Sequence, residues 1–257
     1  MNFFFGVNQG DIQSKISIPK FQNSGKFNKD NLLYSASIIN SKWFIKRENT
    51  EETVSFFKIK ANEIDNHKIF FIATEQEVSR YFSNNSGEKL EDLNTFSNTS
   101  PSFRCNLKVF KKKNGYSSYQ SEYPFIMTKK KGSILSSLYL LTNKNAENNY
   151  VLIRNIFHMP TNEAFKFYIV DVENQKILFE ENLKLNYSNL IKIDNKFINK
   201  NFYIFTSDYL GIPIYLSEKN GDLSFEHTHP PHTYILNKNK YEIVGNLKKK
   251  INEIISK

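Results

Sequence analysis

Residues 212–232 read IPIYLSEKNGDLSFEHTHPPH, and this stretch decides the fold class. Asn220-Gly221 is the strongest two-residue signal for a β-hairpin, because a type I′ turn needs positive φ at both central positions. If these two residues form the loop, Lys219 pairs with Asp222 and the register continues outward residue by residue. The stretch therefore predicts two antiparallel strands joined by a tight turn.

Further strands are predicted along most of the chain. Before residue 80, the segments rich in β-branched and aromatic residues are 32–40, 43–47, 53–60 and 68–73. After residue 100 they are 104–113, 116–127, 133–141, 150–157, 164–172, 176–185, 190–193 and 202–207. Short strands at this spacing are typical of antiparallel sandwiches. We expect a mostly β fold, either an antiparallel β-sandwich or a jelly-roll-like barrel.

Two helices are predicted beside the strands. Thr74 and Glu77 form a capping-box pattern at the start of a short helix near 74–82. A C-terminal helix is predicted over 246–255, where the apolar residues share one face and the lysines at 248–250 point away from it. The expected place of this helix is over a sheet edge.

A polar stretch at residues 83–102 separates the predicted strands into two groups. It predicts a small N-terminal β-rich domain or extra layer over 1–90, and a sandwich or jelly-roll domain with the C-terminal helix over 103–257. With 257 residues, of which 39% are hydrophobic and 15% aromatic, the chain is long enough for each unit to bury a core.

The net charge of +9 comes almost entirely from lysine, since only four of the 35 basic residues are arginine. Lys, Asn, Phe, Ile and Tyr are the residues that an AT-rich genome encodes by default, and phosphate binders usually use arginine as well as lysine. We therefore do not expect a nucleic-acid partner. The single cysteine excludes an intramolecular disulfide, and no segment is apolar over the ~18 residues that a membrane helix needs. The expected location is cytoplasmic, with no membrane contact.

Three of the five histidines lie within six residues. In the hairpin register, Ile214 faces His227 and Ile212 faces His229, so both imidazoles share the apolar face of the strand. Two imidazoles at positions i and i+2 can converge on one divalent transition metal, and iron, zinc, copper and nickel are all chemically possible. The alternative is a pair of hydrogen-bonded core histidines.

A third metal ligand is available in two places. His232 follows Pro230-Pro231, which should be extended, so it reaches the same metal only if the chain bends there. His158, before Met159, is the other candidate. The candidate metal ligands are therefore His227, His229, His232 and His158.

The spacing Gly221-x5-His227-x-His229 resembles the opening of the first motif of the cupin family. That resemblance implies a jelly-roll barrel that holds a metal inside. It covers nine residues, and Thr233 and Tyr234 stand where the glutamate of the family motif would be. The chain that follows is too short for the second histidine motif of the family, so no family is assigned.

Ligand contacts are predicted on another strand and from two arginines. Asn114-Gly115 predicts a tight turn, and in the strand after it Tyr119 and Tyr123 share one face with serines, which suits a sugar or planar ligand. Where lysine is the default cation, Arg104 and Arg154 are candidates for holding a carboxylate or phosphate of a substrate. Structural ion pairing is the alternative for both.

Two functions follow from these patterns. The first is a metal-dependent enzyme that acts on a small polar or anionic molecule, with the histidines leaving an open position for water or substrate. The alternative is a non-enzymatic β-sandwich module that binds carbohydrate or a protein partner. The sequence does not decide whether the protein is an enzyme, and it gives neither the substrate nor the oligomeric state.

Overall fold

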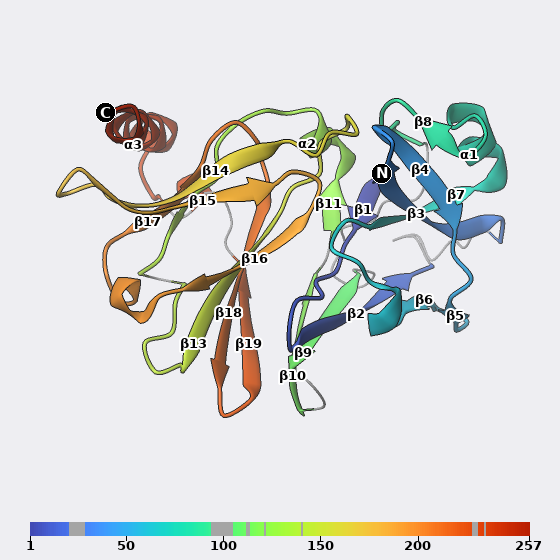
Figure 1. The fold of residues 1–257 in the computed structure, drawn as a ribbon, viewed down its shortest axis with the longest axis horizontal. Helices are drawn as coiled ribbons and strands as arrows, with labels where there is room; N and C mark the ends of the chain where they lie inside the picture. Colours follow the sequence, from blue (N-terminus) through green and yellow to red (C-terminus); the bar gives the residue numbers. More distant parts are fainter. Residues whose placement is uncertain are drawn as a thin grey trace.

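The strands of the computed structural model pair in antiparallel register. The structure describes residues 1–20, 29–93, 105–111, 114–120, 122–139, 141–227, 231–233 and 235–257, and of residues 114–120 and 227 it describes the backbone. Within these ranges the strands form four sheets, which are arranged like the blades of a propeller-like ring (Figure 1). We number them sheets 1 to 4.

Sheets 1 and 2 come mainly from the first half of the chain. Sheet 1 has the order β11-β1-β7-β3-β4-β8, with β1 (Asn2–Phe4), β3 (Asn31–Ile39), β4 (Lys42–Arg47), β7 (Ile69–Thr74), β8 (Ser86–Gly87) and β11 (Glu122–Pro124). Sheet 2 has the order β10-β9-β2-β6-β5, with β2 (Ile12–Pro19), β5 (Glu51–Glu52), β6 (Phe56–Ile59), β9 (Asn106–Lys111) and β10 (Asn114–Gln120).

Sheets 3 and 4 come from the second half. Sheet 3 has the order β12-β17-β14-β15, with β12 (Leu135–Ser137), β14 (Ala164–Asp171), β15 (Lys176–Lys184) and β17 (Tyr203–Thr206). Sheet 4 has the order β16-β13-β18-β19, with β13 (Asn148–Arg154), β16 (Ser188–Ile193), β18 (Ile212–Lys219) and β19 (Asp222–His227).

The helical elements are short except at the C-terminus. They are α1 (Glu75–Tyr81), α2 (Phe125–Thr128) and α3 (Lys240–Ile255), with 3-10 turns η1 (Ala61–Glu63), η3 (Asn195–Phe197) and η4 (Pro231–Thr233). The capping box of the first helix is confirmed: Thr74 Oγ1 accepts the Glu77 N–H, and the Glu77 carboxylate accepts the Thr74 N–H. No helix in the described ranges is long and apolar enough to cross a membrane.

The predicted hairpin around Asn220-Gly221 is confirmed. Lys219 pairs with Asp222, and the register runs on to Ile214 opposite His227. Asn220 and Gly221 have φ values of 55° and 86°, as a type I′ turn requires. The other turn prediction is wrong: Asn114-Gly115 is not the two-residue loop, because Asn114 of β10 pairs with Lys111 of β9 and the register shifts just after it.

Strands from both sides of the predicted domain boundary share sheets. β9 pairs with β2 and β11 pairs with β1, so residues after 105 complete sheets that begin before residue 20. The division into units 1–90 and 103–257 stays a prediction.

The mostly β, antiparallel fold with a C-terminal helix is confirmed, but the sheets form a ring and not a clear sandwich. The reason is that sheet 4 is buried on both faces. Val151 and Ile153 of β13 point into the core shared with sheet 3, while Leu152 between them points into the core shared with sheets 1 and 2. Strand alternation predicts two faces, but not that both are covered.

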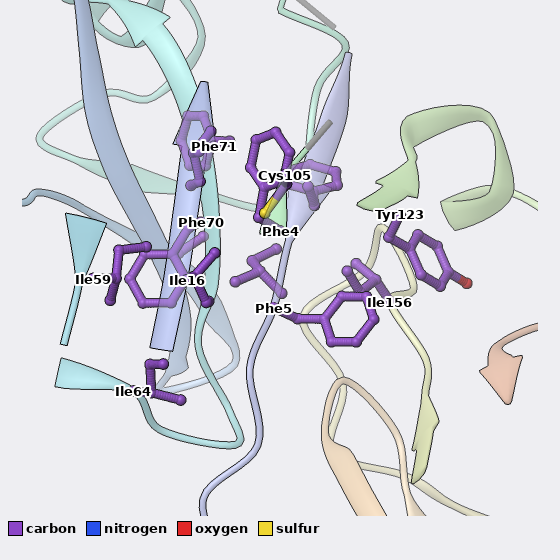
Figure 2. Close-up of a cluster of buried hydrophobic side chains, with 14 of the residues drawn as sticks. Phe4, Phe5, Ile16, Ile59, Ile64, Phe70, Phe71, Cys105, Tyr123 and Ile156 are labelled. Atoms are coloured by element: carbon purple, nitrogen blue, oxygen red, sulfur yellow. The ribbon is translucent and has the colours of Figure 1, made fainter. Parts of the chain in front are cut away.

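The core shared by sheets 1, 2 and 4 is rich in aromatic side chains. Figure 2 shows Phe4, Phe70, Phe71 and Cys105 among its side chains. Tyr123 and Phe5 belong to the same cluster and are fully buried. On the far side of the molecule, α3 covers the outer face of sheet 3 rather than a sheet edge, through a separate apolar cluster.

Candidate functional site

A cleft of about 540 Å³ lies between helix α3 and the ends of strands in sheets 3 and 4. Its apolar lining residues are Met127, Ile134, Leu135, Leu210, Ile212, Pro213, Pro231 and Val244. Its charged or polar side chains are Lys130, Ser133, His232 and Lys248. A mostly apolar cavity with a few polar groups is the usual form of a small-molecule site. We call it the α3 cleft.

Helix packing brings α3 to the cleft. Ile251 and Ile254 are buried against sheet 3, which fixes the rotation of the helix about its axis. Val244 and Lys248 lie one turn apart on the adjoining part of that surface, because residues four apart share a helix face. The buried isoleucines therefore hold Lys248 at the cleft wall.

The ammonium of Lys248 belongs to the more buried of the two lysines that line the α3 cleft. Its Nζ donates a hydrogen bond to the Ser133 carbonyl at 2.8 Å. Burial lowers the pKa of Lys248 below its ordinary value of 10.5. Among the described residues, no carboxylate forms an ion pair with it. A half-buried cation with one neutral acceptor would gain from an anionic partner.

The floor of the cleft is held from behind by two buried donors. The Leu210 carbonyl accepts hydrogen bonds from Asn155 Nδ2 at 2.7 Å and from the Tyr123 hydroxyl at 3.2 Å. Burial raises the pKa of Tyr123 far above its ordinary value, so the hydroxyl remains a neutral donor. Gly211 follows, and a Cβ there would lie 2.7 Å from Asn155 Nδ2. The floor thus depends on close packing at glycine.

The histidine cluster is partly at this cleft. His232 lies in η4, lines the cleft, and packs on Tyr241 with ring centroids 5.0 Å apart. The backbone of His227 ends β19, whereas its side chain and the whole of His229 lie outside the described residues. The predicted metal centre at His227 and His229 therefore stays a prediction.

His158, the other candidate third ligand, has backbone partners. Its Nδ1 lies 3.2 Å from the Thr128 carbonyl, and its ring packs on Phe157 at 4.6 Å. Its own carbonyl accepts the Trp43 indole N–H at 2.7 Å. Within the described part of the chain, no three His, Cys, Asp or Glu side chains are grouped so that they could hold a metal ion.

Arg154 is fully buried at the end of β13 and away from the cleft surface. Its Nη1 donates to the Asn66 carbonyl at 2.6 Å and to Ser188 Oγ at 3.1 Å. Burial lowers the pKa of Arg154 to about 9, which leaves the side chain charged at pH 7. In this structure the guanidinium joins two segments of the fold, and its predicted contact with a substrate stays a prediction.

The remaining predicted ligand contacts lie in two settings. Tyr123 is fully buried and acts through the Leu210 carbonyl, so it positions the floor of the α3 cleft. Arg104 and the side chain of Tyr119 lie outside the described residues.

Sequence reasoning missed Lys248, which was expected to point away from the apolar face of the helix. The helix begins at Lys240, earlier than the predicted start at 246, so Val244 also belongs to it. The spacing Val244, Lys248, Ile251 then places the lysine within the apolar surface. A correct helix start would have revealed this position.

No protein-family model, curated protein or solved structure is found to match this chain.

Proposed function

We propose that this protein binds a small anionic molecule with an apolar body in the α3 cleft. The observation that carries the proposal is the Lys248 ammonium, half-buried among apolar walls without a described carboxylate partner. Burying an ammonium is costly unless it is paired, and an anionic ligand supplies the missing partner. The walls then receive the apolar part of the same ligand.

The arrangement of the lining supports a bound orientation. The anionic group of the ligand would lie between Lys248 and the more exposed Lys130, which gives it two charge-assisted hydrogen bonds. Ile134 and Leu210 border the same cavity and provide apolar surface for the remainder. The His232 ring lies at the same wall as Lys248 and adds a hydrogen-bonding group.

Matched carboxylate and amide probes test this proposal. Octanoate should bind to the purified protein in isothermal titration calorimetry, and octanamide, which has the same chain without the charge, should bind at least tenfold more weakly. Lys248→Met should weaken octanoate binding at least tenfold, whereas Lys249→Met, at an exposed neighbouring position, should leave it unchanged. The proposal would be refuted if octanoate and octanamide bind equally well, or if Lys248→Met binds octanoate with the wild-type affinity.

A metal centre beside the α3 cleft is a second candidate function. It is favoured by the observed register, which puts His227 opposite Ile214, and by the position of His232 in the cleft wall. A divalent transition metal there would supply a Lewis acid for a small polar or anionic substrate.

Metal content decides this second candidate. Protein purified without a nickel column should contain nearly one metal ion per chain, His227→Ala should lose it, and His67→Ala, at an exposed histidine elsewhere, should retain it. If protein from a metal-supplemented culture contains no metal, the metal centre is excluded. The proposal that the α3 cleft binds an anionic molecule is not affected by that result.

A further inference from the structure

A second cavity, of about 620 Å³, lies on the outer face of sheet 2. β2 and β6 form much of it, and in Figure 1 they lie across the molecule from α3. Strand alternation places Ile16 and Ile59 in the core, so Lys15 and Lys58, one residue before each, lie on the outer face. Lys108 joins them from β9. We call this cavity the lysine cleft.

The lysine cleft is strongly basic. Lys15, Lys58, Lys60 and Lys108 line it with one carboxylate, Glu51, so the net formal charge of its lining is +3. Glu51 forms ion pairs with two of these lysines: its Oε1 lies 3.6 Å from Lys58 Nζ and its Oε2 lies 3.6 Å from Lys60 Nζ. Lys15 and Lys108 contribute the other two positive charges of the lining.

Strand pairing sets two of these lysines directly against each other. Lys15 of β2 faces Lys108 of β9 in the antiparallel register. Like charges at directly opposed positions destabilise a sheet. A ligand with several negative charges bound over this face would attract both ammonium groups.

We propose that the lysine cleft binds a small molecule carrying two or more phosphate groups. Lysine binds phosphate as a point charge, and four ammonium groups around one cavity suit a compact cluster of negative charges. The cavity also offers amide and hydroxyl groups, from Asn8, Gln13, Ser17 and Asn62, which can bond phosphate or sugar oxygens. Its volume lies within the ~300–1,000 Å³ typical of small-molecule pockets.

Inorganic tripolyphosphate is the probe that tests the site. It should raise the melting temperature of the wild-type protein and bind in calorimetry with an affinity that falls as salt is added. Lys15→Gln/Lys58→Gln should bind at least tenfold more weakly, and Lys15→Arg/Lys58→Arg should retain most of the affinity. Lys60→Gln/Lys108→Gln repeats the test with other side chains if the first pair folds poorly.

Charge-matched controls separate a local site from a general effect of net charge. Lys176→Gln/Lys249→Gln removes two exposed lysines elsewhere and should bind tripolyphosphate as the wild type does. Glu51→Gln removes the carboxylate of the cleft and should tighten binding severalfold.

Three results would overturn the proposal. The first is that the wild type does not bind tripolyphosphate, and the second is that the control pair loses as much affinity as Lys15→Gln/Lys58→Gln. The third is that single-stranded oligonucleotides displace tripolyphosphate and bind more tightly as they become longer. The last would indicate an extended phosphate backbone and not a small ligand. Octanoate binding at the α3 cleft should be unchanged in all these variants, so the two sites fail or succeed separately.

Discussion

Replacing Gly211 by alanine tests whether the floor of the α3 cleft is built by close packing. An added Cβ would lie 2.7 Å from Asn155 Nδ2, 2.8 Å from the Arg154 carbonyl oxygen and 3.0 Å from Ile134 Cδ1. Atoms in ordinary van der Waals contact lie about 3.5–4.0 Å apart. Asn155 and Arg154 are fully buried, so neither can move into open space.

The expected cost has two parts. Overpacking a well-packed interior by one methyl costs ~1–3 kcal/mol. Displacing Asn155 also weakens its 2.7 Å hydrogen bond to the Leu210 carbonyl, which adds ~1 kcal/mol. We therefore expect Gly211→Ala to lower the free energy of unfolding by ~2–4 kcal/mol.

Urea unfolding measures this loss, provided that the slope m stays at its wild-type value. The matched control is Gly245→Ala in α3, where a Cβ meets nothing within 4 Å. Because alanine is the better helix former, this control should gain ~0.5–1 kcal/mol. Octanoate affinity should fall in Gly211→Ala, since the floor of the α3 cleft moves. Gly245→Ala should keep the wild-type octanoate affinity. A Gly211→Ala protein with the wild-type midpoint and affinity would refute the account of the floor.

Three other predictions concern single interactions. Thr74→Ala should cost ~1 kcal/mol in urea unfolding, because the Thr74 hydroxyl accepts the Glu77 N–H at the start of α1. Burial raises the pKa of Glu218, but hydrogen bonds, first from Lys111, outweigh it and leave the pKa below 4.5. The stabilisation from this carboxylate is thus present above pH 4.5 and lost as the pH falls through its folded pKa. Lys111→Met should remove on the order of 2 kcal/mol at pH 7 and reduce this acid-dependent loss. Octanoate affinity should fall as the pH rises, because the Lys248 ammonium loses its proton. The fall should begin at a lower pH than for an exposed lysine, since burial lowers the pKa of Lys248. Lys248→Arg should move that fall to higher pH, and an unchanged pH profile would show that Lys248 does not hold the anion.

Features set by a few neighbouring residues were predictable from the sequence. The Asn220-Gly221 turn and the Thr74–Glu77 capping box are both confirmed, since each depends on residues within three positions. The Asn114-Gly115 dipeptide also depends on neighbouring residues, but it forms a different structure from the one predicted. Asn114 pairs with Lys111, and the register shifts just after it, so these residues form an irregularity within a strand. A bulge, like a tight turn, can use glycine, and the dipeptide alone does not distinguish them.

The arrangement of the sheets could not be read from strand patterns. Alternation assigns Val151 and Leu152 to opposite faces of β13, yet both are fully buried, in different cores. What covers each face depends on strands far away in the chain. The candidate site was hidden for the same reason, because the floor at Leu210 is held by Asn155 and Tyr123, which lie 55 and 87 residues away.

Arg154 shows how one buried cation can organise several distant segments. Its guanidinium binds the Asn66 carbonyl and Ser188 Oγ, and Ser188 in turn donates to the Gly6 carbonyl at 2.6 Å. Ser188 lies opposite Arg154 in the pairing of β16 with β13, whereas Asn66 and Gly6 lie outside the strands. These hydrogen bonds therefore tie the segments at Asn66 and Gly6 to sheet 4. A buried guanidinium without a described carboxylate partner is costly, and an apolar residue would avoid that cost. Its backbone carbonyl also lies where a Cβ at Gly211 would clash. The side chain of Arg154 thus joins the two halves of the chain, and its backbone borders the floor of the α3 cleft.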